Sequence, residues 1–294
     1  MSKEKLELMK HGKGFIAALD QSGGSTPKTL ALYGVTPDMY ADEKAMFEKI
    51  HGMRTRIINA PSFNSDRILG AILFENTMNS NIDGIPTSDY LWDKLHIVSF
   101  LKVDKGLDPL KDGVQLMKDD PNLPTLLDTA VQKGIFGTKM RSVIKEYNRA
   151  GIEKIVDQQF EVADIILSKG LIPIVEPEVD IHAEDKAKIE TYLHQLIHRK
   201  LDALGPLKVI LKLTPPEEDN LYYDFVTHQN IVRVAFLSGG YPQALANEKL
   251  SKNKGVIASF SRALSDGLNV NQDDAAFNET IKASIDAIYD ASIK

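Results

Sequence analysis

Cysteine is absent from the 294-residue chain. Its absence excludes a disulfide framework, a thiolate zinc site and a cysteine nucleophile, and it fits a reducing cytoplasm. Long apolar runs are absent too, because none approaches the roughly 20 residues that span a bilayer. The first 14 residues also lack the apolar core of a signal peptide. We therefore expect a cytoplasmic protein with no membrane partner.

A positive charge balance is the third feature that the chain lacks. Its 35 basic and 41 acidic residues give a net charge of −6, and the two signs are mixed along the chain without a basic block. This distribution predicts no nucleic-acid partner. A phosphorylated substrate would need a local basic pocket rather than a field from the whole protein. The hydrophobic share of 43% is typical of a folded globular protein.

Short β-type segments recur along the whole chain. Eight of them are predominantly apolar: 14–20, 68–74, 97–104, 134–142, 171–179, 207–214, 231–240 and 255–263. Between them, residues 150–170 have apolar residues near helical spacing. Residues 183–205 begin with acids and end with bases, which suits a helix dipole. Lys-Gly pairs at 13–14, 133–134, 169–170 and 254–255 are typical of helix ends.

This alternation predicts an α/β fold. Eight strands with helical connections favour one domain over residues 1–294, a single (β/α)8 or TIM barrel with an N-terminal helical extension. A doubly wound open sheet is the alternative, but the first strand is followed by DQSGGSTP rather than by G-x-G-x-x-G. The polar stretch 106–124 is expected to be a loop on the barrel rim.

One lysine lies inside an otherwise apolar β-type run. Lys212 belongs to VILKL at 209–213, and a buried strand of this kind is normally continuous in Val, Ile and Leu. A buried ammonium group costs several kcal/mol unless it is paired or loses its proton. For Lys212 alone, an edge strand with the lysine facing water is the simpler interpretation. The other strand ends favour a different one.

Charged and polar residues gather where the predicted strands end. In a (β/α)8 barrel, chemistry takes place at the C-terminal ends of the strands, and residues two apart in a strand point to the same face. Because helices cover the outside, we expect such pairs to face the mouth and to form an active site. The set comprises Asp20, Lys102, Asp104, Lys139, Arg141, Glu176, Glu178, Lys212, Ser238, Gly239, Gly240, Ser259, Ser261 and Arg262.

These residue types select a chemistry. Lysine forms an imine with a ketone or an aldehyde only as the neutral amine, a form that burial and neighbouring cations favour. Lys212 suits that role, and Glu176 and Glu178 can transfer protons. The Ser-Gly-Gly segment at 238–240 and Arg262 can hold a phosphate. The combination predicts Schiff-base chemistry on a phosphorylated carbonyl compound.

Eight stretches carry a family resemblance: GKGFIAALDQSGGS, ILFENTM, LKVDKGLDPL, TKMRSV, IPIVEPEV, LKLTP, FLSGG and SFSRAL, in this order from Gly12 to Leu264. With them the chain resembles a class I fructose-1,6-bisphosphate aldolase of the short bacterial type. VDKG, PIVEPE and FLSGG are together the most specific. The resemblance implies a lyase of glycolysis and gluconeogenesis that cleaves fructose 1,6-bisphosphate to dihydroxyacetone phosphate and glyceraldehyde 3-phosphate, without a metal or cofactor.

The resemblance also implies a role for each site residue. Lys212 matches the Schiff-base lysine and Glu176 the general acid/base, with Glu178 as its partner. Asp20 matches the aspartate at the reacting hydroxyls, and Lys139 the lysine near the imine. The implied substrate- and phosphate-binding residues are Lys102, Arg141, Ser238, Gly239, Gly240, Arg262, Ser261, Ser22 and Ser25.

The chain departs from the family pattern at four places. Met140 stands where the family often has Trp, and Gln21 where an acid commonly follows the aspartate. The FSRA segment is shorter than in animal relatives. The chain ends in YDASIK, where animal relatives carry a terminal tyrosine, and Tyr289 is expected to lie in a helix. We expect a sugar phosphate as the small-molecule partner, and a monomer or a small homo-oligomer.

Alternative functions remain open from the sequence. A zinc-dependent aldolase would need a histidine cluster, and only His194 and His198 have helical spacing, on a predicted outer helix; the other five histidines show no grouping. A transaldolase or a deoxyribose-phosphate aldolase would use the same imine, and a related aldolase could prefer tagatose 1,6-bisphosphate. A non-catalytic sugar-phosphate-binding scaffold is the alternative outside the enzymes.

Overall fold

Eight parallel strands form a ring in the computed structural model, which describes residues 2–294. The backbone N–H of Ala18 donates to the carbonyl of Phe260 at 3.2 Å and joins the last strand segment to the first. All eight predicted strands are thus confirmed. In barrel order they are β1 (Phe15–Leu19), β2 (Ile68–Leu73), β5 (Val98–Lys102), β7 (Gly137–Ile144), β8 (Ile172–Val179), β9 (Val209–Leu213), β10 (Ile231–Phe236) and β11 (Ile257–Ala258).

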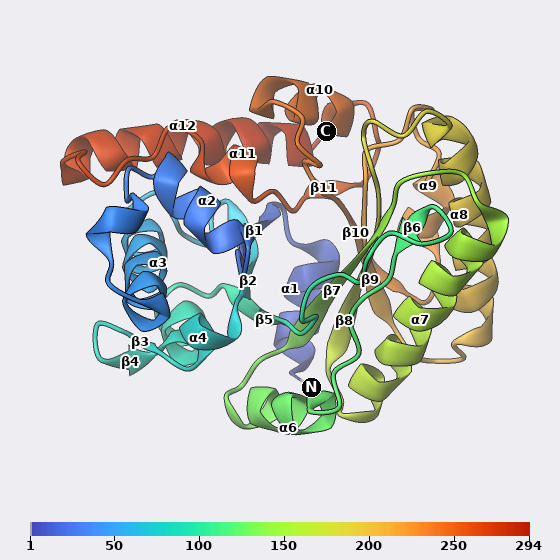
Figure 1. Ribbon diagram of the computed structural model, residues 1–294, viewed down its shortest axis with the longest axis horizontal. Coiled ribbons are helices and arrows are strands. Elements are labelled where there is room, and N and C mark those ends of the chain that lie inside the picture. Colours follow the sequence, from blue (N-terminus) through green and yellow to red (C-terminus); the bar gives the residue numbers. More distant parts are fainter. Residues whose placement is uncertain (1) are drawn as a thin grey trace.

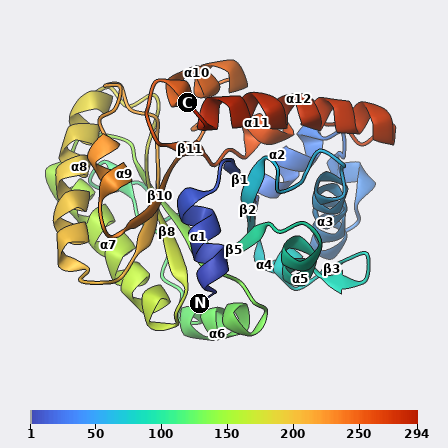
Figure 2. The same cartoon turned by 180° about the vertical axis from the view of Figure 1, so that it is seen from behind.

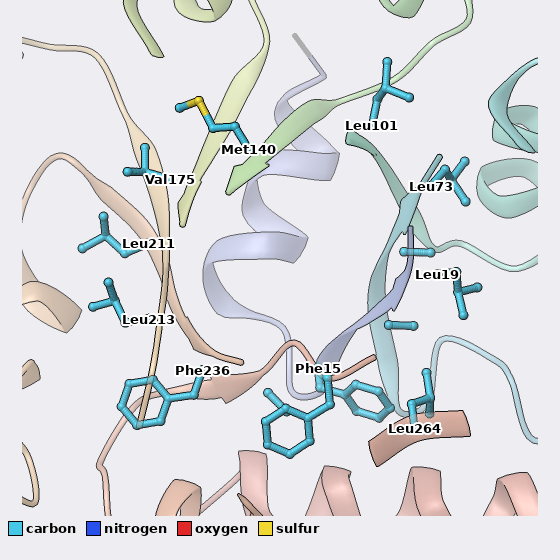
Figure 3. Close-up of a cluster of buried hydrophobic side chains, with 14 of the residues drawn as sticks. Phe15, Leu19, Leu73, Leu101, Met140, Val175, Leu211, Leu213, Phe236 and Leu264 are labelled. Atoms are coloured by element: carbon cyan, nitrogen blue, oxygen red, sulfur yellow. The ribbon is translucent and has the colours of Figure 1, made fainter. Parts of the chain in front are cut away.

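The strands separate two apolar layers, because their side chains alternate between the two faces. One layer fills the barrel and includes Ile16, Phe100, Ile174 and Ile210. The other surrounds the barrel; Figure 3 shows its side chains, among them Met140, pointing away from the ring of strands. Residues an even number of positions from an inner-layer residue on the same strand therefore also point into the barrel.

Helices cover the outside of the barrel (Figure 1). The two predicted helices are confirmed as α7 (Arg149–Ser168) and α8 (Lys186–Ala203). They pack against each other and are drawn in yellow-green and yellow in Figure 1. The others are α2 (Ser25–Leu32), α3 (Glu43–Ile58), α4 (Glu75–Met78), α5 (Thr87–Asp89), α6 (Leu123–Gln132), α9 (Tyr223–Thr227), α10 (Gln243–Ser251), α11 (Arg262–Ser265) and α12 (Asp274–Ser292), with a 3₁₀ turn at Pro37–Met39 and a π turn at Tyr90–Lys94. Within residues 2–294, no helix combines the length and apolarity that crossing a membrane requires.

The N-terminal extension is helix α1 (Lys3–His11), which lies across the end of the barrel where the strands begin (Figure 2). Its Met9 is fully buried in the inner layer. Arg233 of β10 donates to the carbonyls of Met9, at 2.8 Å, and Gly12, at 2.9 Å, which fastens the end of the helix to the barrel. Burial lowers the pKa of Arg233 to about 10, so it is still a cation at neutral pH. The predicted N-terminal helix is confirmed as a cover for this end.

Local predictions had mixed outcomes. The rim stretch 106–124 is mostly irregular, but it contains β6 (Val114–Gln115), which pairs antiparallel with β7. A small hairpin, β3 (Asn81–Ile82) and β4 (Ile85–Pro86), has no counterpart among the predicted strands. Helices α6 and α7 end at the predicted Lys-Gly pairs, with a positive φ at each glycine. The other two Lys-Gly pairs follow helix ends by two or three residues, because α1 ends at His11 and α10 at Ser251.

Candidate active site

A cavity of about 560 Å³ opens at the C-terminal ends of the strands. This end of the barrel is opposite the one that α1 covers (Figure 1). The predicted site residues that line it are Asp20, Ser22, Ser25, Lys102, Asp104, Lys139, Arg141, Glu176, Glu178, Lys212, Ser238, Gly239, Ser259, Ser261 and Arg262. Gly240 is the one predicted residue outside this lining. The alternation of strand side chains thus brings residues from seven strands or strand ends into one chamber.

Lys212 lies in the wall of this cavity, two residues beyond the interior residue Ile210 on β9. Only 5% of its side chain is exposed, so it is not an edge-strand lysine facing water. Its Nζ lies 3.1 Å from Oε1 of Glu176, the residue two positions beyond Ile174 on β8. A buried amine in contact with a buried carboxylate is the arrangement that a proton transfer between the two requires.

Lys139 of β7 is the second buried lysine. Its Nζ lies 2.9 Å from Asp20 Oδ2 and 2.9 Å from Glu176 Oε2, so it bridges two carboxylates. Burial works to lower the pKa of Lys139, but the charges of Asp20 and Glu176 outweigh it and raise that pKa above its ordinary value. Burial alone would raise the pKa of Asp20, yet attraction to Lys139 and Lys212 holds it well below its usual range. Lys139 is therefore a fixed cation and Asp20 a fixed carboxylate at neutral pH.

Two further ion pairs extend the network towards the rim. Arg141 Nε donates to Glu178 Oε2 at 2.5 Å, and this pairing outweighs the opposing effect of burial and raises the arginine's pKa. Glu178 is therefore the partner of Arg141, whereas Glu176 holds the two lysines. Lys102 Nζ donates to Asp104 Oδ1 at 2.6 Å and to its carbonyl at 2.7 Å. Of the five pairs, the three that involve Lys139 or Lys212 are the most buried.

Polar groups suited to phosphate lie on the rim. Ser238 follows β10, and Gly239 and Gly240 adopt positive φ values of 60° and 105°, which L-residues with side chains rarely adopt. The glycine conformations let the backbone turn sharply beside the guanidinium of Arg262, which would lie 3.2 Å from a Cβ at Gly240. Gly240 thus shapes the turn without lining the cavity itself. This turn lies on the same cavity wall as Arg262.

A second polar turn follows β1 on the rim. Ser25 Oγ accepts from the backbone N–H of Ser22 at 3.0 Å and donates to its carbonyl at 2.9 Å. Ser261 accepts from Gln21 Nε2 at 2.8 Å, which ties the segment after β11 to the one after β1. The departure at Gln21 therefore has a visible consequence, because its amide can donate a hydrogen bond that a carboxylate could not.

Two residues of this region, Lys28 and Arg54, were missed as site residues. Lys28 of α2 lines the cavity, although only the preceding serines were predicted. Ser259, which was among the strand-end residues expected at the mouth, also lines the cavity, and its buried Oγ has no hydrogen-bond partner among residues 2–294. Arg54 of α3 is fully buried and donates to Thr77 Oγ1 at 2.8 Å and to the Gln21 carbonyl. Burial lowers the pKa of Arg54 to about 10 against the opposing pull of Asp20. Nothing in its helical sequence context signals this contact.

No histidine of residues 2–294 lines the cavity, and His194 and His198 lie on α8. His194 Nε2 contacts Asp224 at 2.9 Å, as expected of a helix outside the barrel. The expectation that His228 belongs to no group was wrong, because the turn before β10 brings its Nε2 to 3.3 Å from Asp202, which also contacts His198. His228 Nδ1 accepts from the backbone N–H of Asn230, so Nε2 is its protonated nitrogen and faces Asp202 as a donor.

Tyr289 lies in α12, as predicted. Its ring lies 4.4 Å from the guanidinium carbon of Arg67, and the residue is not part of the cavity lining. The C-terminal helix therefore packs against the barrel wall in this structure.

A (β/α)8 barrel with buried lysines and carboxylates at its mouth is the architecture of a barrel enzyme. The chain matches the family model described as "Glycolytic: Fructose-bisphosphate aldolase class-I" over residues 1–211. It is 58% identical to a relative called fructose-bisphosphate aldolase class 1 from Synechocystis sp., over 99% of this chain and 98% of the relative. Relatives of the same name from Porphyromonas gingivalis and Clostridium acetobutylicum are each 55% identical over 100% of both chains.

The fold agrees with a solved relative. A structure of fructose-bisphosphate aldolase from Plasmodium falciparum superposes with a TM-score of 0.81 at 20% identity, covering 99% of this chain and 94% of that chain. This likeness concerns the fold, which is a TIM barrel. The chain belongs to the class-I fructose-bisphosphate aldolase family.

Proposed function

We propose that this chain cleaves fructose 1,6-bisphosphate reversibly to dihydroxyacetone phosphate and glyceraldehyde 3-phosphate through a Schiff base on Lys212. Family membership supports the reaction. The observation that carries the residue assignment is the buried contact, 3.1 Å, between Lys212 Nζ and Glu176 Oε1 in the wall of a cavity that is otherwise rich in cations.

The first half of the reaction builds an electron sink. The neutral amine of Lys212 attacks C2 of the ketose. Glu176, as a carboxylic acid, gives its proton to the carbonyl oxygen and takes one back from the attacking nitrogen, which leaves a neutral carbinolamine. Glu176, as a carboxylic acid, then donates a proton to that hydroxyl, which leaves as water and leaves an iminium. Glu176 suits both transfers because its two oxygens face the two buried lysines, Oε1 towards Lys212 and Oε2 towards Lys139.

The second half breaks carbon–carbon bond C3–C4. A carboxylate takes the proton of the C4 hydroxyl, the C4–O carbonyl forms, and the bonding pair of C3–C4 moves into the iminium to give an enamine. Glyceraldehyde 3-phosphate leaves, a proton adds to C3, and water releases dihydroxyacetone phosphate from Lys212. We assign the base to Glu176, with Asp20 aligning the hydroxyl, since the lowered pKa of Asp20 keeps it a charged acceptor.

The remaining residues hold the substrate. The turn of Ser238, Gly239 and Gly240 with Arg262 is proposed for one phosphate, and Ser22, Ser25 and Lys102 for the other. Ser261 and Arg141 are proposed to complete the rim, and Glu178 to orient Arg141 through their 2.5 Å ion pair. Fixing both phosphates places C2 over Lys212, which converts binding energy into orientation.

Trapping the imine tests the proposal directly. The protein is incubated with dihydroxyacetone phosphate and EDTA and reduced with borohydride, and the modified peptide is identified by mass. A reduced adduct on Lys212, together with chelator-insensitive cleavage of fructose 1,6-bisphosphate, is the expected result. An adduct on Lys102 or Lys139 would overturn the assignment of the nucleophile. No adduct and cleavage abolished by EDTA would overturn the Schiff-base mechanism, and no adduct with no cleavage would favour the scaffold.

Further features of the protein stay predictions. We propose that residues 1–294 act as one domain, because one sheet runs from β1 to β11 without interruption. The cytoplasmic location and the monomeric or small homo-oligomeric state are predicted from the sequence.

The cleavage assay that accompanies the trapping experiment also measures the preference for the configuration at C4, when it is repeated with tagatose 1,6-bisphosphate as the substrate.

A further inference from the structure

Two adjacent glutamines of α7 contact the backbone of two different segments, Glu176 in the cavity wall and Met117 in the rim stretch 106–124. Gln159 is fully buried, and Gln158 is half-buried. Each side-chain amide pairs with one residue's backbone N–H and C=O. Neither glutamine lines the active-site cavity.

Gln159 contacts the backbone of Glu176. Its Oε1 accepts from the Glu176 N–H at 3.3 Å, and its Nε2 lies 3.4 Å from the Glu176 carbonyl. The same Nε2 donates to Ser142 Oγ on β7 at 2.9 Å, which fixes the orientation of the amide. Strand β8 pairs with β9, the Lys212 strand, only at Ile174 and Val175, so this pairing ends just before Glu176, whereas the pairing with β7 continues to Val179. Gln159 thus holds the main chain of Glu176 where the pairing with β9 stops.

Gln158, unlike Gln159, contacts the rim stretch 106–124. Its Oε1 accepts from the Met117 N–H at 2.9 Å, and its Nε2 donates to the Met117 carbonyl at 2.8 Å. Met117 bridges to Leu107, and the neighbouring Lys118 N–H donates to the Gly106 carbonyl at 3.0 Å. Leu107 and Gly106 line the cavity.

The rim segment connects in turn to the Lys102 pair. The Gly106 N–H donates to Asp104 Oδ1 at 3.3 Å, and the same oxygen accepts from Lys102 Nζ at 2.6 Å. Hydrogen bonds and short stretches of backbone therefore connect Gln158 with the lysine that is proposed to bind phosphate.

We propose that Gln159 and Gln158 are positioning residues for the two halves of the reaction site. Gln159 sets the position of Glu176 against Lys212 and thereby affects the chemical steps. Gln158 sets the rim segment and Lys102 and thereby affects substrate binding. This inference rests on the proposed aldolase function, because it divides the effects between kcat and KM of that reaction.

Methionine variants test the division, since methionine is close to glutamine in length and lacks the amide. We expect Gln159→Met to lower kcat about 10- to 100-fold with KM changed less than twofold, because small displacements of a catalytic group have effects of this size. We expect Gln158→Met to raise KM about tenfold, the scale of lost hydrogen bonds, with kcat changed less than twofold. Each variant is the matched control for the other.

A double-mutant cycle separates positioning from general destabilisation. In a Glu176→Gln background, Gln159→Met is expected to lower kcat less than twofold further, because the group that it positions is already disabled. Gln158→Met is expected to keep its full effect on KM in that background. If Gln159→Met does not fold, Ser142→Ala replaces it as the variant, because it removes only the partner that orients the amide, and a fall in kcat of about threefold is then expected.

Two results would overturn the inference. One is lower thermal stability in both variants with kcat and KM unchanged, which would make the glutamines structural only. The other is an equal change of the same constant in both variants. Activity of the wild-type chain separates this inference from the proposed function: an inactive wild type that traps no adduct overturns both, whereas an active wild type with unaffected variants overturns the inference alone.

Discussion

The two ends of the barrel are built on the same strands and have opposite chemistry. At the end where the strands begin, α1 covers the barrel, Met9 fills the interior, and Arg233 hydrogen-bonds to the end of the helix. At the end where they finish, buried lysines and carboxylates line an open cavity. On β9, for example, Ile210 belongs to the apolar interior and Lys212 to the cavity, one step of alternation apart.

The comparison shows how one fold separates stability from chemistry. Apolar residues in the lower barrel stabilise the fold by burial, whereas buried ion pairs contribute little net stability because desolvation opposes their attraction. The charged residues at the mouth are therefore explained by what they do to a ligand. Substitutions at the mouth should remove activity and spare stability, and substitutions at the base should do the reverse.

Lys212→Met is expected to have the largest effect on activity. The variant keeps a side chain of similar length and removes the nucleophile, so we expect kcat to fall by at least about 10⁴-fold, the scale seen when a covalent nucleophile is removed. Glu176 keeps its contact of 2.9 Å with Lys139, so the free energy of unfolding should fall by less than the roughly 3–5 kcal/mol lost when a buried charge is left without any partner. Cleavage assays and urea unfolding measure the two quantities on the same sample.

Lys139→Met is the control for that substitution, because it removes the other buried lysine. It should still form a reducible adduct on Lys212. An adduct in the Lys212→Met variant at an unchanged rate would contradict the assignment of the nucleophile. Loss of folding in Lys212→Met would contradict the separation of stability from chemistry.

Arg233→Met tests the base of the barrel and should have an intermediate effect. The substitution removes two charge-assisted hydrogen bonds to the end of α1, so we expect a loss of about 2–3 kcal/mol in the free energy of unfolding. Since this arginine lies at the closed end of the barrel, kcat and KM should stay within about twofold of wild type, the small change expected of separate sites. Exposed Arg199 on α8, changed to Met, is the matched control. A fall in kcat as large as that in a mouth variant would break the comparison.

The barrel and most of its mouth could be predicted from the sequence for a physical reason. A parallel strand that is covered on both faces appears as an apolar run, and a charge inside it, such as Lys212, is conspicuous. Spacing by two residues then assigned Lys139 and Arg141, and also Glu176 and Glu178, to one face. The C-terminal ends of the strands meet by construction, so residues far apart in sequence could be placed together.

The partners of these charges could not be predicted in the same way. Alternation gives the direction of a side chain but not the neighbour that it meets, so the pairing of Glu178 with Arg141 had to come from the structure. Residues that act from helices, such as Arg54 and Gln159, occupy ordinary helical positions and gave no signal. The grouping of His228 with α8 depends on how a short turn packs, which sequence spacing does not encode.

Acid stability is the smallest predicted difference between the two ends. Because the pKa of Asp20 is lower in the folded protein than its ordinary value of about 3.9, its ion pairs stabilise the fold above that value. This stabilisation is lost as the pH falls through the lowered folded pKa. Wild-type unfolding should therefore become easier between about pH 4 and pH 2 in a way that Asp20→Asn reduces. Exposed Asp290→Asn on α12 is the control, and urea unfolding at each pH gives the slopes. If both variants follow the wild-type slope, Asp20 is not held as a carboxylate by the lysines, and its proposed part in aligning the C4 hydroxyl loses its electrostatic basis.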